Sequence, residues 1–425
     1  MEEGFKNNIE MQYGYQLKRT DMKIKHLSYA ILFASLYATG THAEQVTRAE
    51  IQQLKSEVDE LKALLKQTNA VQPESQAPVT QPSTSFKNWQ SKSGATVNLY
   101  GFIRADMAYQ FEGAKGIFNS PHTVALEDAA DKRATEDRFD STLTTTRIGL
   151  DFSTPLDEKS LKGKIEVDFR GGENKDTVRL RHVYLSYDRW LIGQTTSTFL
   201  STETAPEMLD FNTALGGGTT RNPMVRYSQP INAETMYFLS LEKGNDENRL
   251  PLLAGKVKYD FAEGDGLITA RGLLQEVRLR DIDDKTELGW GAALGLRYKF
   301  TPSLLLNTNY SHVSGDNKIL LATSDNRRYI QEGNDIELID YNAFQVGTTY
   351  HFNEKLRSTL GYGALIYEKN NDTANKKLQQ GWINMMYKPY KPLTLGVEYV
   401  YGKRNTVNDR EGEDSRLEMM AKYDF

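Results

Sequence analysis

The sequence has no cysteine, and its 425 residues include only 12 proline, six histidine and four tryptophan residues. Without thiols, the chain can form no disulfide, thiolate metal site or cysteine nucleophile. After residue 43 no apolar run approaches the roughly 18 residues that a spanning helix requires. The formal net charge of −5 is mildly acidic and argues against nucleic-acid binding. A membrane location would therefore require strands that close into a barrel.

Alternating apolar residues recur through most of the chain. In the last run the apolar positions are Leu417, Met419, Ala421, Tyr423 and Phe425. This run ends on an aromatic, polar, aromatic triplet, and the same triplet occurs at 259–261, 298–300 and 350–352. Successive strand side chains point to opposite faces, and rings with a polar tip are favoured at membrane interfaces. The pattern predicts an all-β transmembrane barrel of about 16 antiparallel strands, residues 95–425, with lipid around it.

The connections alternate between short turns and long polar loops, as in outer-membrane barrels. We expect upward strands to begin near residues 97, 164, 190, 233, 267, 303, 356 and 393. Downward strands should cover 141–152, 178–187, 224–229, 252–261, 288–300, 342–352, 378–388 and 415–425. An aqueous lumen is expected at this strand number.

The first 43 residues are typical of an upstream extension followed by a secretory signal. Lys23 and Lys25 precede an apolar stretch at 27–36, and small residues follow up to Ala43. Residues 1–43 should therefore be removed. Between 70 and 94 a Pro/Gln/Ser-rich stretch indicates an extended linker.

Residues 44–69 have the spacing of a short coiled coil. The apolar positions alternate at intervals of three and four residues, at Ile51, Leu54, Val58, Leu61 and Leu65. Pairs such as Glu50 with Lys55 have the spacing for salt bridges between parallel helices. The alternative is a single amphipathic helix lying against the barrel. In either case we expect this helix in the periplasm.

Arginine recurs on the face opposite the apolar one. The alternation places Arg104, Arg147, Arg170, Arg226, Arg297, Arg357 and Arg416 in the lumen. The directions of Arg179, Arg181 and Arg271 are uncertain, because apolar residues continue the same face. These ten are the candidate pore-lining and solute-binding residues. The alternative is that they only pair with inward acids, which are Asp106, Asp151, Glu166, Asp168, Glu398 and Glu418. Guanidinium groups bind carboxylates bidentately, and rings of cations in a pore select anions.

The long connection at 195–222 combines apolar residues such as Phe199, Leu209 and Phe211 with Glu203, Glu207 and Asp210. An exposed loop has little need for so many apolar residues. We expect it to fold into the lumen, where its acids could face the arginines across a constriction. The alternative is packing over the mouth or against a neighbouring subunit.

Four segments are similar to one known family: LYGFIRADMAY at 99–109, RHVYLSYDRWLIGQT at 181–195, RNPMVRYSQP at 221–230 and the terminal AKYDF. With the coiled-coil and linker patterns, they resemble the DcaP-like trimeric porins of Gram-negative outer membranes. The resemblance implies a 16-stranded homotrimer that passes small anionic solutes such as dicarboxylates. The final strand, with Tyr423 and Phe425, also looks like the signal read by the barrel-assembly machinery.

Other classes of protein fit less well. The histidines after residue 43, His122, His182, His312 and His351, have no companion catalytic or metal-binding motif. We therefore predict no enzyme activity, metal or cofactor. A sugar-selective or general porin is the nearest alternative, since Tyr100, Phe102 and Tyr367 could line a stacking path. A non-conducting structural protein of the envelope is the third hypothesis.

Overall fold

The computed structural model describes residues 88–90, 94–323, 328–333, 335–368 and 374–425. The chain divides into two units between Pro82 and Ser83, and the described residues all belong to the second. The expected signal segment, coiled-coil helix and most of the linker lie outside them. Within the expected linker range, strand β1 (Asn88–Gln90) pairs with the start of β2 (Thr96–Glu112). No helix in the described ranges is long and apolar enough to cross a membrane.

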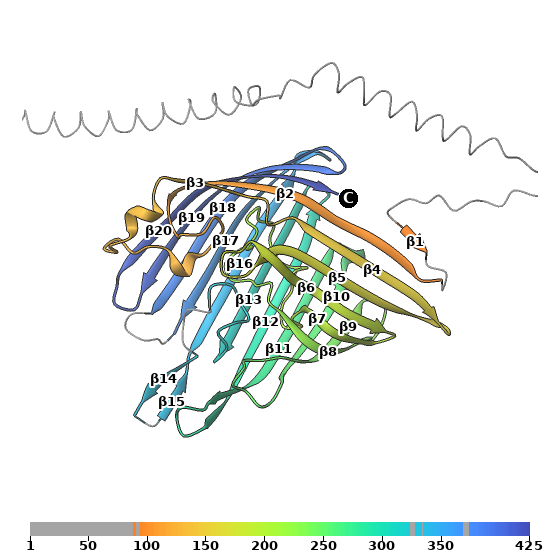
Figure 1. Cartoon of the computed structure of the whole chain (residues 1–425), viewed down its shortest axis with the longest axis horizontal. Helices are drawn as coiled ribbons and strands as arrows, with labels where there is room; N and C mark the ends of the chain where they lie inside the picture. Colours follow the sequence, from red (N-terminus) through yellow and green to blue (C-terminus); the bar gives the residue numbers. More distant parts are fainter. Residues whose placement is uncertain (1–87, 91–93, 324–327, 334, 369–373) are drawn as a thin grey trace, which may run out of the picture. The chain divides into compact units, whose positions relative to one another are not determined.

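The long strands form a closed antiparallel barrel (Figure 1). Within the described ranges it has sixteen strands, as the sequence predicts, when β3 and β4 are counted as one strand and the short β1 is left out. The ring closes where β2 pairs with the last strand, β20, on one side and with β3 and β4 on the other. The expected strand at 141–152 is split into β3 and β4. The strands after β2 are β3 (Arg138–Thr142), β4 (Arg147–Leu156), β5 (Lys159–Gly171), β6 (Thr177–Tyr187), β7 (Trp190–Thr196), β8 (Arg221–Pro230), β9 (Thr235–Glu242), β10 (Leu252–Phe261), β11 (Gly266–Leu279), β12 (Lys285–Thr301), β13 (Leu304–Ser314), β16 (Asp340–His351), β17 (Leu356–Tyr367), β18 (Asn375–Tyr390), β19 (Leu393–Thr406) and β20 (Glu411–Asp424).

Smaller elements lie between these strands. Strands β14 (Tyr329–Glu332) and β15 (Asp335–Leu338) pair only with each other. Short 3₁₀ helices occur at Pro121–Thr123, Lys132–Thr135 and Ala262–Gly264.

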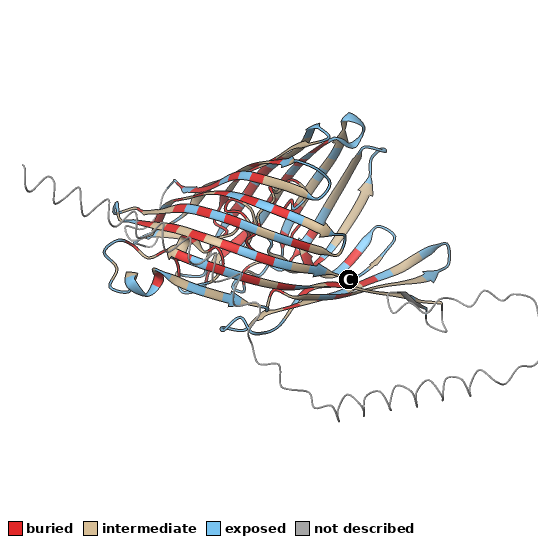
Figure 2. Cartoon of the chain, turned by 90° about the horizontal axis from the view of Figure 1, so that it is seen from above, coloured by how far each residue is buried: buried red, intermediate tan, exposed pale blue. Residues whose placement is uncertain are grey.

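The two faces of the wall differ as the alternation predicts. Ile103 is 58% exposed, whereas its neighbour Arg104 is 9% exposed. Figure 2 shows this alternation of buried and exposed residues along many strands. At the end with short turns, the rings of Tyr259, Phe261 and Tyr298 follow one another at 6.1 and 5.7 Å between centroids. The aromatic triplets therefore belong to a girdle at this edge of the barrel.

Residues 197–220, between β7 and β8, fold into the barrel, and we call this segment the inner loop. Phe199, Leu200 and Leu215 on this loop are no more than 3% exposed. They pack against inward-facing apolar residues of the wall, including Leu252, Leu273, Val313, Ala343, Leu365 and Leu378. The apolar residues of the inner loop thus form a core inside the barrel rather than an outer loop surface.

A second connection, between β2 and β3, also turns inward. The backbone nitrogen of Asn119 donates to Asp210 of the inner loop at 2.7 Å, and its side chain bonds Gln380 of β18. The rings of Phe118 and Phe211 lie 5.7 Å apart. The sequence predicts only a long polar loop between the strand that begins near 97 and the one at 141–152, so this inward contact was not expected. Phe118 and Asn119 of this connection therefore contact the inner loop between Asp210 and Thr213.

Candidate functional site

Hydrogen bonds attach the inner loop to the wall at β9 to β20. Asn309 of β13 donates to the carbonyl oxygen of Thr204 at 2.9 Å, and Asn307 donates to that of Ala205 at 2.7 Å. The indole nitrogen of Trp382 donates to the carbonyl oxygen of Glu207 at 2.9 Å. Because these bonds use backbone atoms of the loop, they fix its path rather than single side chains.

The acids of the inner loop bind cations of the same wall. Glu203 pairs with Lys256 at 3.2 Å, and Glu207 pairs with Arg357 at 2.7 Å. Asp210 lies 3.5 Å from Arg416. The sequence suggested that these acids face arginines across a constriction. Their carboxylates instead form direct ion pairs that anchor the loop.

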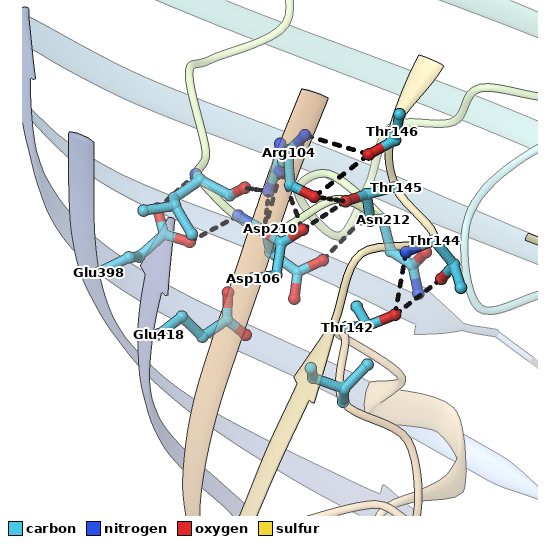
Figure 3. Close-up of polar contacts among 12 residues, drawn as sticks. Arg104, Asp106, Thr142, Thr144, Thr145, Thr146, Asp210, Asn212, Glu398 and Glu418 are labelled. Carbon is cyan, nitrogen blue, oxygen red and sulfur yellow. Dashed lines mark hydrogen bonds and ion pairs between the residues drawn. The ribbon is translucent and has the colours of Figure 1, made fainter. Parts of the chain in front are cut away.

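The tip of the inner loop bridges the seam where the first and last barrel strands meet (Figure 3). Arg104 of β2 donates to the carbonyl oxygen of Leu209 at 2.7 Å. On the other side of the seam, the carboxylate of Glu398 on β19 accepts from the backbone nitrogens of Leu209 and Asp210, at 2.7 and 3.0 Å. One short segment therefore contacts both sides of the barrel closure.

Phe211, next to this tip, is surrounded by arginines. The guanidinium carbons of Arg104, Arg147, Arg170 and Arg181 lie 5.5, 6.0, 6.0 and 5.9 Å from the centre of its ring. Cations are attracted to a ring face within about 6 Å. Strands β2, β4, β5 and β6 thus present their cations to the loop tip.

The carboxylates on β5 form close ion pairs with only some of the arginines of β4, β5 and β6. Arg179 binds Asp168 through two nitrogens, at 2.9 and 2.7 Å, and Arg181 contacts both Glu166 and Asp168. Arg147 reaches Glu166 only at 3.4 Å. Arg170 makes no ion pair within 4.0 Å to any carboxylate of the described ranges. Its side chain contacts Thr144 and the ring of Phe118.

A β-bulge explains why the directions of Arg179 and Arg181 were uncertain. Val167 faces Leu180, whereas the preceding Glu166 faces His182, so Arg181 is an extra residue in β6. A bulge shifts the alternation by one residue. Both arginines therefore point inward, while the apolar residues on either side of the bulge point outward.

The remaining candidates are spread around the lumen. Arg271 is 7% exposed and donates to the carbonyl oxygen of Phe199, which places it under the inner loop. Arg226 lies 5.7 Å from the ring of Phe238. Arg297 lies on the same face of β12 as Gly295, which is buried. A Cβ atom at Gly295 would collide with Thr204 of the inner loop, so the loop lies close to this face. With Arg357 and Arg416 bonded to the loop acids, the ten arginines do not form a single cluster.

Sequence reasoning missed several cations. Arg221 lines a cavity of about 380 Å³ with Arg179, His122 and Lys318, and no acidic residue of the described ranges lines this cavity. Arg221 lies five residues before Arg226, so strict alternation assigns it to the other face. Lysines were also overlooked, although Lys164 bonds the hydroxyl of Tyr100 at 2.7 Å. Arg221 begins the RNPMVR segment, which is part of the resemblance to the DcaP-like porins, and this was the one indication in the sequence that Arg221 could be functional.

The histidines form no catalytic grouping in the residues that can be described. His182 contacts Thr195 at 2.9 Å, and His312 contacts Asn342 at 3.1 Å. Within the same ranges, no group of three or more His, Asp or Glu side chains is placed to hold a metal ion.

The sequence model of the DcaP outer membrane protein family matches residues 41–425. The chain belongs to this family. The outer membrane channel DcaP of Acinetobacter baumannii is 43% identical, with a TM-score of 0.74, and the match covers 79% of this chain and 99% of that chain. No curated protein matches the sequence. This DcaP-family protein is therefore an outer-membrane porin.

More distant porins share the fold alone. An anion-selective porin from Comamonas acidovorans is 12% identical, with a TM-score of 0.56, and the match covers 78% of this chain and all of that one. The trimer form of OmpT from Vibrio cholerae is 16% identical, with a TM-score of 0.52, over 78% of this chain and 99% of that chain.

Proposed function

We propose that this DcaP-family porin is a diffusion channel for small anionic solutes, including dicarboxylates, and that it has no catalytic role. The observation that carries the proposal is the group of four guanidinium groups around Phe211. The inner loop brings only its tip to these cations, and other parts of it are bonded to the wall at β9, β13 and β18. Solutes that pass the loop tip would therefore pass the cations of β4, β5 and β6.

The balance of charge on this wall favours anions. Arg147 and Arg170 lack close bidentate carboxylate partners, so they can bind a passing carboxylate. A diacid offers two carboxylates to two such groups, and a planar guanidinium binds each one bidentately. Cationic side chains in a narrow pore also raise the local concentration of anions.

The aromatic residues do not favour a sugar path. Lys164 lies 4.2 Å above the ring of Tyr100, and Arg147 lies 5.0 Å from the ring of Phe102. Tyr367 is 5% exposed and packs against Tyr341. Sugars stack on bare rings, whereas Tyr100 and Phe102 carry cations and Tyr367 is buried.

We propose a homotrimer as the assembly. The same fold occurs as a trimer in OmpT, and the predicted coiled coil at 44–69 would associate neighbouring chains. The predicted helices would associate more strongly in an assembled trimer, because the barrels hold the three N-termini at a high local concentration.

Reversal potentials of reconstituted channels in a potassium chloride gradient test the selectivity. The native channel should prefer chloride, most strongly in dilute salt, because the Debye length shrinks from about 10 Å at 0.1 M to about 3 Å at 1 M. Arg147→Glu with Arg170→Glu should turn the preference toward potassium. The control is Lys159→Glu with Lys299→Glu, which makes the same charge change at exposed positions. A native channel that prefers potassium would contradict the proposal, and absence of conductance would favour the structural alternative.

A further inference from the structure

A partly open cavity lies between the inner loop and the wall, and none of the four arginines around Phe211 lines it. Its volume is about 240 Å³, and both limbs of the loop line it, from Leu200 to Met208 and from Thr213 to Thr219. The wall contributes Arg271 of β11, Asn309 and Ser311 of β13, and Gln345 of β16. This space is large enough for several water molecules or a small solute.

Arg271 is a buried cation without a carboxylate partner. Its guanidinium group donates to the carbonyl oxygen of Phe199 at 3.1 Å and to the side-chain oxygen of Asn309 at 2.9 Å. Both acceptors are neutral, and the Nε atom has no acceptor. Among the described residues, no carboxylate oxygen lies within 4.0 Å of it.

The nearby acids are already bound to other cations. Glu207 also lines the cavity, but its carboxylate binds Arg357 through both oxygens. Glu203 pairs with Lys256 of β10. A buried charge that lacks a close counterion is costly, so an anion from outside the chain would stabilise the guanidinium group of Arg271.

A second donor in the same cavity is unpaired. Gln345 is 1% exposed, and its amide oxygen accepts from Asn309 at 3.0 Å, which leaves the amide nitrogen without a partner. The loop approaches this group closely, since a Cβ atom at Gly217 would lie 2.5 Å from that nitrogen. Glycine therefore keeps the space beside the amide nitrogen open.

We infer that this cavity binds a small anion, either a halide or a small carboxylate, with Arg271 and Gln345 as donors. The anion neutralises Arg271 and thereby holds the inner loop against β11, β13 and β16. This site is separate from the proposed path past Phe211. A channel that proved cation-selective would contradict the proposed function and leave this inference standing.

Bromide gives the direct test, because its anomalous scattering identifies the ion. Crystals of the full-length protein in bromide should show an anomalous peak in this cavity, in contact with Arg271. Water alone in the cavity, in bromide crystals and in acetate crystals alike, would overturn the inference. Adding acetate to the bromide crystals in a chloride-free buffer distinguishes a halide from a carboxylate as the ligand. If acetate removes the bromide peak, the site prefers a carboxylate. If the peak remains, the site prefers a halide.

Thermal unfolding in detergent gives an independent readout. Replacing gluconate by chloride at constant ionic strength should raise the Tm saturably, by about 2 °C or more, because a ligand of the native state stabilises it. Arg271→Gln should abolish this rise. Arg297→Gln is the matched control: it removes one inward charge outside the cavity lining and should keep the rise. If chloride raised the Tm of the native protein and of Arg271→Gln equally, the result would count against the site. If Arg271→Gln does not fold, the bromide experiment decides.

Discussion

Arg357 and Glu207 form a two-pronged ion pair, with Nε and Nη2 of the arginine at 2.8 and 2.7 Å from the two carboxylate oxygens. The pair joins β17 to the middle of the inner loop. Both side chains are only partly exposed, at 21% and 32%. The geometry of this contact depends on a planar guanidinium group, which lysine cannot reproduce.

Breaking this pair should loosen the inner loop. Glu207→Gln leaves Arg357 without its carboxylate, and we expect noisier single-channel current and a stability loss of about 1–3 kcal/mol, typical of a hydrogen bond to a charged group. The swapped double variant Glu207→Arg with Arg357→Glu should recover most of the quiet current. If the single and swapped variants were equally noisy, the ion pair would not be the anchor.

Arg416 should be among the most sensitive residues of the barrel. It is 1% exposed and lies 3.5, 3.3 and 3.2 Å from Asp210, Asp414 and Glu418. Arg416→Met would leave these acids without their cation, so we expect a loss of about 3–5 kcal/mol in denaturant unfolding.

The comparison for Arg416 is Arg410→Met. Arg410 forms an ion pair with Asp128 on the exposed surface, where solvent screens the interaction and little stability is expected to depend on it. Similar losses for the two variants would show that the buried group does not depend on Arg416.

Acid should weaken the anchor at Glu203. Burial alone would raise the pKa of this carboxyl group, but the Lys256 ammonium 3.2 Å away and the Ser201 hydroxyl hold the pKa below its ordinary 4.5. A carboxyl with a lowered pKa stabilises the fold fully above about pH 4.5 and loses that contribution as the pH falls through the lowered value. Glu203→Gln should be less stable at neutral pH and lose part of the acid dependence of Tm.

Asp246 supplies the control for this measurement. It forms an exposed ion pair with Lys243 at 2.9 Å, and no inner-loop contact depends on it. Asp246→Asn should keep the acid dependence of the native protein. The same curve for the native protein and Glu203→Gln would exclude Glu203 as an acid-sensitive anchor.

Removal of the N-terminal segments tests what holds the proposed trimer together. Salt bridges on the surface of the predicted coiled coil, such as Glu50 with Lys55, would contribute under about 1 kcal/mol each, so most of the association should come from the barrel. A chain that begins near Gly94 should remain trimeric in mild detergent and lose some heat resistance, measured by native mass spectrometry and heating before electrophoresis. A clean monomer would contradict this expectation.

The alternation of residues predicted the barrel and most strands because lipid and water impose opposite requirements on the two faces. The alternation failed at a β-bulge, where the two faces of the strand change places, and where other residues of the chain pack against the inner face of the barrel. The bulge at Arg181 reverses the alternation within one strand, and no local pattern reveals which residue is extra. Arg271 was ambiguous because Leu267 and Leu273 on its face are buried by other residues inside the barrel rather than exposed to water. The contacts of Asn119 depend on residues up to 261 positions away, which spacing along the chain cannot predict.

The position of the loop tip across the β2–β20 seam also sets an order of assembly. Leu209 bonds Glu398, 189 residues later in the chain, and Arg104, 105 residues earlier. The contact with Glu398 cannot form until β19 has been added, and such distant pairings form slowly because of the chain entropy that they cost. The inner loop should therefore dock only as the ring closes, so that newly inserted barrels pass briefly through a wider and less selective state before they mature.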